Sequence, residues 1–525
     1  MSATSAEDRP SGRRAQLRAV VLGDIGRVDN YHLGDEAMTE VAIEQLTARG
    51  VRDITLAAVD PATAQAFYGV PAVRQFGFAW NWSRQKVEAA LTGLTEALRD
   101  GTATGPLVEA VRAADLVVIA GGGNLTSEYP LHVYERVAFS RIAAHFGVPL
   151  FVTSQTVGPV LRARERDLVT EIIDAAVCFG ARERFSTELV RELAADPERV
   201  RLTLDDGVLL RADESARTDA TELNLGERII VASFAADQGA TGWSREEYAP
   251  KVARLLDELA EALDARVVLA PHTGGLEPAA ASRDHQLGLD IAAAGSGAIT
   301  ALPVLPAREY LAILEAAMLS ISTRYHPTVF APALGVPTVG IAMSQYSSVR
   351  MRGALGNVGL ERFVVPAAAW DQLVPASLDA VANGAPAAEQ ARSAAGYQAR
   401  WWDAIVDAAE RGRWTGPDEY RPPEPIDVDA AWSVLSERIA PLFDTLTAER
   451  VVAKLQLEEA AAALATAESR AREERLRADG LERRLAELGA ERDGLRGQLA
   501  AARDRRIVKV ADTVGEIARR VRGRG

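Results

Sequence analysis

Thiols and long apolar runs are what this sequence of 525 residues most clearly lacks. Cys178 is its only cysteine, which excludes a framework of disulfides and a metal site built from several thiolates. No run of about 20 apolar residues occurs, so no transmembrane helix is predicted. No apolar segment of the secretory type follows the polar N-terminus. The sequence therefore predicts a cytoplasmic protein in which Cys178 packs as a small apolar side chain.

Basic residues are in the minority as well. The 59 lysines and arginines stand against 73 acidic residues, which gives a net charge of −14. This balance argues against a protein that binds nucleic acid through the phosphate backbone. It leaves room for a local basic pocket that takes one small anion.

What the sequence has in quantity is short apolar runs that alternate with amphipathic segments. This alternation is typical of an α/β fold with doubly wound parallel sheets. It covers residues 18–211, stops in a polar, loop-like stretch (212–227) and resumes over residues 228–415. We expect two Rossmann-like domains that face a cleft, with helices between residues 375 and 414 that cross back over it. Residues 1–17 are predicted to be disordered.

One stretch in the second half, residues 318–346, predicts a binding site. Residues 318–322 form an apolar run of the kind that fills a buried parallel strand. Arg324 and His326 follow where that strand should end, and Pro327 suits the first turn of a helix. Ligands of open α/β sheets bind at the carboxyl ends of strands, and helix N-termini favour anions. A fixed cation and an imidazole at this place suit a phosphorylated or carboxylated ligand.

The motif S-x-R-x-H, followed by a short apolar helix and by G-V-P-x-V-G-I, resembles the polysaccharide pyruvyl transferase family. Members of this family move a pyruvyl group from phosphoenolpyruvate to a sugar as a ketal. The resemblance covers about residues 18–375, over which five short motifs occur in the family's order. It implies a GT-B-like pair of domains, a glycan or glycolipid of the cell surface as acceptor, and no cofactor besides the donor substrate.

Another of these motifs, G-D-I-G-R-V-D-N-Y-H-L-G-D-E, lies between a predicted strand and a predicted helix. Acids in the first turn of a helix are favoured by its dipole alone, so the carboxylates by themselves do not establish a site. The family carries an Asn and Gly-Asp-Glu here, which implies that Asn30 and Gly34 bind substrate. The resemblance also implies Asp35 as the base for a sugar hydroxyl, with Glu36 as the second choice.

Two further motifs follow predicted strands of the first half. Three glycines in a row let a ligand approach the backbone closely and supply N–H donors. Their spacing matches neither the dinucleotide fingerprint nor the P-loop, but the family also has three glycines here. Gln155 lies in S-Q-T-V-G-P, similar to the family's G-Q-x-x-G-P, and either hydrogen-bonds a substrate or serves the turn. The substrate-binding candidates of these motifs are Gly121, Gly122, Gly123, Asn124 and Gln155.

The remaining candidates are cations and a histidine at strand ends. Arg182 lies in a segment that resembles the family's R-D-x-x-S, with Glu183 replacing Asp, and a guanidinium clamps a carboxylate or phosphate with two parallel hydrogen bonds. His272 ends a predicted strand and is either a ligand contact or a capped loop histidine. The family often carries a lysine after the last apolar strand. Here Arg350, one residue later, is the candidate for that charge.

The resemblance implies a mechanism without a metal. His326 acts as the general acid for the methylene of phosphoenolpyruvate, and Arg182, Arg324 and Arg350 neutralise the carboxylate and phosphate of the donor. Two alternatives from other classes stay open. One is a nucleotide-sugar-dependent glycosyltransferase of the GT-B type, and the other is a non-catalytic scaffold for polysaccharide assembly.

The C-terminal part has a different composition. Residues 416–445, with four prolines at their start, are predicted to be a linker, and residues 446–510 a coiled coil that joins copies of the chain. The seam is interrupted by Glu474 and Arg492 and is rich in alanine in its first half, so a solvated single helix, or a helix packed on its own domain, stays open. The basic tail, residues 511–525, is either a solubilising segment or a contact with the inner face of an anionic membrane.

Overall fold

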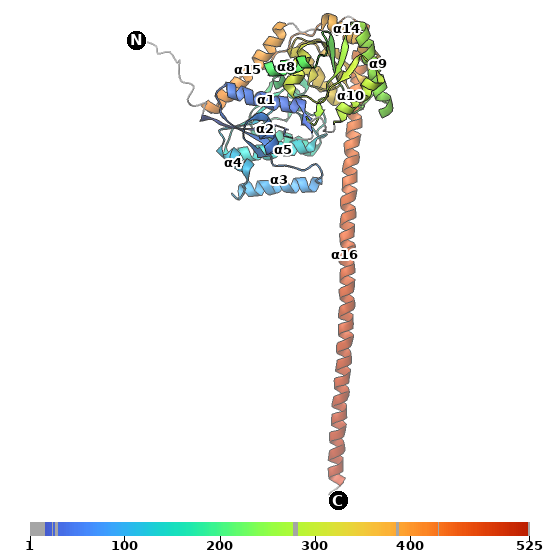
Figure 1. Cartoon of the computed structure of the whole chain (residues 1–525). Coiled ribbons are helices and arrows are strands. Elements are labelled where there is room, and N and C mark those ends of the chain that lie inside the picture. The colour runs from blue at the N-terminus through green and yellow to red at the C-terminus, as the bar shows by residue number, and fades with distance from the viewer. Residues whose placement is uncertain are drawn as a thin grey trace, which may run out of the picture. The chain divides into compact units, whose positions relative to one another are not determined.

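The structure is a computed structural model, and it describes residues 16–23, 25–26, 30–276, 282–384, 388–428 and 430–522. All but the last two residues of the predicted disordered segment 1–17 lie outside these ranges. The chain divides into two units, Met1–Val452 and Ala453–Gly525. The first unit contains two parallel sheets covered by helices, and the described residues of the second belong to one helix (Figure 1).

The first sheet has the strand order β4-β3-β1-β5-β7-β8-β9, with β6 paired to β7, and every pairing is parallel. The strand β5 at its centre is wholly apolar and buried, as expected where helices cover both faces of a sheet. The strands are β1 (Arg18–Leu22), β3 (Asp53–Ala58), β4 (Ala72–Arg74), β5 (Leu116–Ile119), β6 (Gly122–Leu125), β7 (Leu150–Val157), β8 (Ala176–Ala181) and β9 (Val200–Leu202). The helices are α1 (Leu33–Ala48), α2 (Pro61–Tyr68), α3 (Arg84–Arg99), α4 (Pro106–Ala113), α5 (Pro130–Phe146), α6 (Ala163–Ala175) and α7 (Arg184–Leu193).

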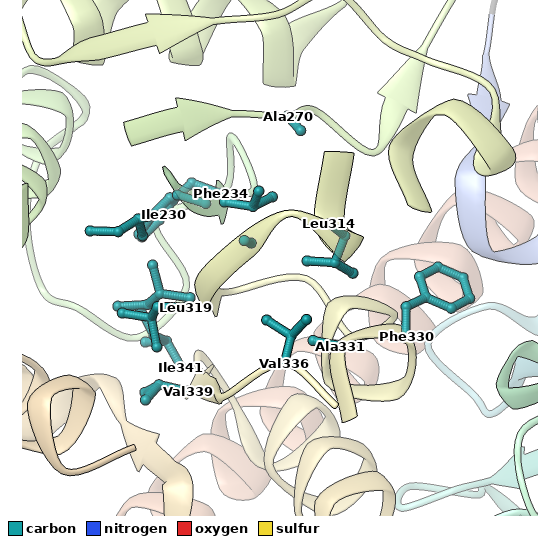
Figure 2. Close-up of a cluster of buried hydrophobic side chains, with 14 of the residues drawn as sticks. Ile230, Phe234, Ala270, Leu314, Leu319, Phe330, Ala331, Val336, Val339 and Ile341 are labelled. Atoms are coloured by element: carbon teal, nitrogen blue, oxygen red, sulfur yellow. The ribbon is translucent and has the colours of Figure 1, made fainter. Parts of the chain in front are cut away.

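The second sheet is also parallel, in the order β13-β11-β10-β14-β15-β16. Figure 2 shows its core, in which Ile230, Leu319 and Ile341 from neighbouring strands lie near one another. The strands are β10 (Ile229–Ser233), β11 (Arg266–Leu269), β13 (Ile299–Ala301), β14 (Ala317–Ser322), β15 (Thr338–Ala342) and β16 (Val364–Pro366). The helices are α9 (Arg245–Leu263), α10 (Arg283–Ala294), α11 (Ala307–Glu315), α12 (Pro327–Ala333), α13 (Gln345–Gly356) and α14 (Leu373–Asn383). The prediction of two parallel α/β sheets is confirmed.

Three segments differ from the sequence-based prediction. Residues 212–227, predicted to be loop-like, contain helix α8 (Glu214–Glu222). Ala216 is its only buried residue, so the segment has no apolar periodicity to reveal it, and the Asp213 side chain caps its N-terminus. Residues 76–105, predicted only as part of the alternating region 18–211, contain α3. Helix α16 (Ala431–Arg522) begins inside the predicted linker.

Two connections join the halves of the first unit. Strands β2 (Tyr31–His32) and β12 (Thr273–Gly274) form an antiparallel ribbon, and beside it the Leu33 amide donates to the His272 carbonyl at 3.0 Å. Helix α15 (Ala388–Arg411) returns to the first sheet, where the Trp402 indole donates to the Asp206 carboxylate at 2.8 Å. These connections place the start of α1 beside the end of β14.

The first turns of α16 belong to the first unit and pack on α13 and β16. Trp432 stacks on Phe363 with ring centroids 5.5 Å apart. The Gln345 amide donates to the Thr447 hydroxyl at 2.8 Å, and the Ser348 hydroxyl donates to Asp444 at 3.0 Å. Among the described residues, no helix is both long enough and apolar enough to cross a membrane.

Candidate functional site

Arg182 lies directly after β8, at the carboxyl edge of the first sheet, and its side chain is fully buried. Its Nε donates to the Thr156 hydroxyl at 2.8 Å and its Nη1 donates to Asp205 Oδ2 at 2.6 Å. The guanidinium carbon lies 4.3 Å from the centroid of the Tyr325 ring. Its Nη2 is buried and has no hydrogen-bond partner in the part of the chain that the structure describes. The guanidinium is thus fixed in place with one donor unsatisfied.

The guanidinium groups of Arg350 and Arg182 both lie beside Gly123. A Cβ atom on Gly123 would lie 2.8 Å from Arg350 Nη1, 2.9 Å from Arg182 Nη2 and 3.1 Å from the Tyr346 hydroxyl. Arg350 stacks on the Tyr346 ring at 3.8 Å, and the Tyr346 hydroxyl donates to the Gly123 carbonyl. A side chain at residue 123 would therefore push the two guanidinium groups away from the backbone.

His326 approaches the same place from the end of β14. Its ring packs on the Cα atom of Gly34, where an added Cβ would lie 1.8 Å from the ring atoms Nδ1 and Cε1. It also stacks on Phe330, with ring centroids 5.6 Å apart. Its Nε2 lies 4.0 Å from Asp205 Oδ2 and is a buried atom without a hydrogen-bond partner among the described residues. We call Arg182, Asp205 and His326 the Arg182 group.

Electrostatics keep the His326 imidazole neutral. Burial lowers its pKa well below the ordinary value of 6.5, and the nearby charges of Arg182 and Arg350 lower the pKa further. The His326 imidazole is therefore neutral in this structure and lies within reach of the charges of Arg182 and Arg350.

A second set of the same residue types lies next to the first. Arg324 donates through Nη2 to Asp284 and, at 3.3 Å, to the Thr273 hydroxyl. His272 packs edge-on against Tyr310 at 4.7 Å. Arg324 Nε and His272 Nε2 are buried and lack a hydrogen-bond partner within the described ranges. Burial lowers the pKa of His272 well below its usual value, with smaller contributions from Arg324 and His326. We call Arg324, Asp284 and His272 the Arg324 group.

Two amide side chains lie beside the glycine turn. A Cβ on Gly122 would lie 3.1 Å from Asn124 Oδ1 and 3.5 Å from Gln155 Oε1. Gln155 donates to the Ala120 carbonyl at 2.6 Å. Neither amide oxygen has a hydrogen-bond partner in the described part of the chain, so both are acceptors suited to sugar hydroxyls. Gly121 contributes to packing, because a Cβ there would lie 2.4 Å from the Met38 sulfur.

The N-terminal motif supplies two carboxylates in different settings. Glu36 is buried, accepts from the Gly26 amide at 3.2 Å and from the Tyr68 hydroxyl, and so holds the loop before α1. Asp35 is half-buried in the first turn of α1. Asn30 is exposed, and its amide lies 2.7 Å from the His32 imidazole. The Glu36 carboxylate is therefore engaged in hydrogen bonds that hold neighbouring segments together.

Asp205 and Asp206 are adjacent in the sequence, but their carboxylates have different partners in the structure. Asp205 belongs to the Arg182 group, and its Oδ1 accepts from the Gly207 amide at 2.8 Å. Asp206 points elsewhere and accepts from Gln398 at 2.7 Å and from Trp402 at 2.8 Å, and burial raises its pKa to about 6. The only sequence signal for Asp205 is its place after a predicted strand.

Sequence reasoning also left Tyr325, Tyr346 and Thr156 out of the site. Tyr325 and Tyr346 stack on the guanidinium groups of Arg182 and Arg350. Aromatic residues next to a basic motif are too common to indicate such stacking from the sequence alone. The prediction for Cys178 is confirmed: it is buried in β8, and burial raises the pKa of its thiol. Within the described residues, no group of three His, Cys, Asp or Glu side chains is arranged to hold a metal ion.

Comparisons with known proteins agree with this geometry. The sequence profile of the family described as "Polysaccharide pyruvyl transferase" matches residues 32–345, which is more than half of the chain. No curated protein matches the chain.

Solved structures share the fold at low sequence identity. A putative UDP-N-acetylglucosamine 2-epimerase from Listeria monocytogenes is 14% identical, with a TM-score of 0.50 over 78% of this chain and 100% of that one. The S. aureus MnaA–UDP co-structure is 11% identical, with a TM-score of 0.52 over 77% of this chain and 100% of that one. This likeness shows the fold alone, a GT-B-like pair of Rossmann-like domains, as the sequence predicted.

Proposed function

Because this chain belongs to the polysaccharide pyruvyl transferase family, we propose that it transfers the pyruvyl group of phosphoenolpyruvate to a sugar of a cell-surface glycan as a ketal and releases phosphate. The observation that carries the proposal is the meeting of Arg182, Arg350 and His326 around Gly123 and Gly34. Two guanidinium groups and an imidazole within one site fit a small ligand with several negative charges.

The two groups offer separate places for the two anionic ends of phosphoenolpyruvate. Arg182 and Arg350 take one end, with the unsatisfied Nη2 of Arg182 as a donor. Arg324, with its unsatisfied Nε, and His272 take the other. Charge-assisted hydrogen bonds from buried donors are stronger than those in water, so the groups fix the donor and polarise it.

His326 supplies the proton that starts the reaction. Binding of the anionic donor offsets the charges of Arg182 and Arg350, which raises the pKa of His326 and protonates it. The imidazolium gives its proton to the methylene carbon, and a sugar hydroxyl attacks the adjacent carbon while Asp35 takes the hydroxyl proton. A second hydroxyl then displaces phosphate, which leaves with that hydroxyl's proton, and the ketal is complete.

The experiment that tests the proposal separates three classes of function. The full chain is incubated with candidate glycans and either phosphoenolpyruvate or nucleotide sugars, and released phosphate, released nucleotide and product mass are measured. We expect phosphate release together with a glycan that has gained one pyruvyl ketal. Nucleotide release would support a glycosyltransferase. A nucleotide, UDP, is named in the S. aureus MnaA co-structure. Neither product, together with no binding of phosphoenolpyruvate, would support a scaffold.

A further inference from the structure

The part of α16 in the second unit carries a row of leucines that are exposed and not part of any hydrophobic core of the described residues. From residue 456 to residue 503 every residue is exposed except the half-buried Gly489. The row consists of seven leucines that are between 45% and 72% exposed: Leu457, Leu464, Leu481, Leu485, Leu488, Leu495 and Leu499. An exposed apolar stripe of this length marks a surface that binds another protein surface.

The spacing of these residues defines a heptad register. The a positions are residues 457, 464, 471, 478, 485, 492 and 499, and the d positions are residues 460, 467, 474, 481, 488, 495 and 502. Up to residue 474 the d positions hold Ala460, Ala467 and Glu474. From residue 478 to residue 502, five of the eight a and d positions hold leucine, so the strong part of the seam is this segment. Leu476 occupies an f position, on the side of the helix away from the seam.

We propose that residues 478–502 form a parallel, in-register, two-stranded coiled coil with a second copy of this chain. In such a pair each g residue lies near the e residue of the following heptad on the other helix. Arg477 then faces Glu482 of the second copy, and Glu491 faces Arg496 of the second copy, each twice by symmetry. In the alanine-rich half the corresponding pair is Arg470 with Arg475, which repels. The charges therefore favour pairing in the same segment as the leucines.

Arg492 at an a position explains why the pair has two strands in one register. A polar residue at a single a position costs stability but specifies register and oligomeric state. In the parallel in-register pair the two Arg492 side chains face each other across the seam, and Glu491 of the opposite copy lies beside each and offsets its charge. A register shifted by one heptad would place Arg492 against leucine and lose this contact.

The first test is the mass of the full chain in solution, by light scattering or sedimentation. We expect a dimer that Leu485→Glu or Leu488→Glu converts to a monomer, because each variant places two carboxylates in the seam. Leu476→Glu is the matched control, since it makes the same change on the outer side and should leave the dimer intact. Circular dichroism confirms that the helix remains. A monomeric wild type, a larger assembly, or equal loss in all three variants would overturn the proposal.

Orientation is tested by oxidation of a single cysteine at the seam. Cys178 is buried, so Leu495→Cys provides the reactive thiol, and a parallel in-register pair should give a disulfide-linked dimer. Leu476→Cys, on the outer side, should not. Arg477→Glu should weaken the dimer about fivefold, and the added change Glu482→Arg should restore it. A Leu495→Cys dimer that does not cross-link, or a charge swap without restoration, would overturn the parallel arrangement.

Discussion

The Arg182 group and the Arg324 group contain the same ingredients in different surroundings. In each, an arginine donates to an aspartate, keeps one nitrogen without a hydrogen-bond partner among the described residues, and lies near a histidine with an unsatisfied Nε2. The Arg182 side chain is 0% exposed, whereas that of Arg324 is 30% exposed. Since charge interactions strengthen as water is removed, the Arg182 group should hold an anion more strongly.

The two groups also differ in how the chain assembles them. The members of the Arg324 group all come from the second half of the first unit. The Arg182 group combines Arg182 and Asp205 from the first half with His326 from the second, which packs on Gly34 of α1. The arrangement of the Arg182 group therefore depends on how the halves are joined, and the comparison predicts larger functional losses for this group.

The largest expected difference lies between the two histidines. His326→Gln should lower kcat by up to about 10⁴-fold, because the general acid is lost, while phosphoenolpyruvate still binds. His272→Gln should raise KM for phosphoenolpyruvate and leave kcat nearly unchanged. Steady-state kinetics of phosphate release measures both. A His326→Gln enzyme that turns over at the wild-type rate would remove this residue from the acid role.

The two arginines should differ next. Arg182→Gln should lower kcat/KM by about 10³-fold, since a buried donor to the anion is lost, and should lower the free energy of unfolding by about 3–5 kcal/mol because Asp205 stays buried without its cation. Arg324→Gln, in a more solvated place, should cost about tenfold or less. Arg254→Gln, at an 82% exposed side chain, is the control. Equal losses of kcat/KM in Arg182→Gln and Arg324→Gln would contradict the expectation that the Arg182 group holds the anion more strongly.

A glycine substitution tests the contact that joins the halves. Gly34→Ala should lower kcat by about 10²-fold, because a Cβ 1.8 Å from the His326 ring forces the imidazole to move. Gly93→Ala is the matched control. It lies within α3, and apart from the nearby backbone of that helix no atom of the described residues lies within 4 Å of its added Cβ. It should stabilise the helix by up to about 1 kcal/mol. An active Gly34→Ala enzyme would show that the His326 position does not matter.

The smallest expected effect concerns stability and is similar for both groups. The folded chain lowers the pKa of His272 and of His326 below 6.5, so below about pH 6.5 the unfolded chain binds protons that the folded chain does not. Each histidine should then cost at most about 1.4 kcal/mol of unfolding free energy per unit of falling pH, and none above that range.

Glu183 acts in the opposite direction. Burial raises its pKa from 4.5 to about 7, so its contribution is present at low pH and is lost as pH rises through about 7. Comparing urea unfolding of wild type, His272→Gln and His326→Gln at about pH 7.5 and pH 5.5 therefore isolates the histidines. Each variant should lose less stability than wild type on acidification. An unchanged pH slope would contradict the buried, neutral state of that histidine.

Much of the fold could be predicted from local patterns. The predicted strand over residues 318–322 lies within β14, and Pro327 begins helix α12, as the apolar run and the proline indicate. Helix α8 was not predicted, because Ala216 is its only buried residue and the segment has no apolar periodicity. The ribbon of β2 and β12 escaped because each strand has two residues and its partner is distant in the sequence.

The site divides in the same way. Sequence motifs select Arg182 and His326. Both lie where the pattern predicts, after the carboxyl ends of β8 and β14. The packing of His326 on Gly34 and the different directions of Asp205 and Asp206 depend on contacts between distant segments. No local pattern encodes such contacts.

Proton uptake on binding of phosphoenolpyruvate tests the central claim most directly. The full chain is titrated calorimetrically with phosphoenolpyruvate near pH 7.5 in two buffers of different ionisation enthalpy. An anion held by Arg182 and Arg350 should protonate His326, so the account predicts binding with uptake of up to about one proton, lost in His326→Gln and kept in His272→Gln. Absence of binding, or binding without proton uptake by the wild-type chain, would contradict it.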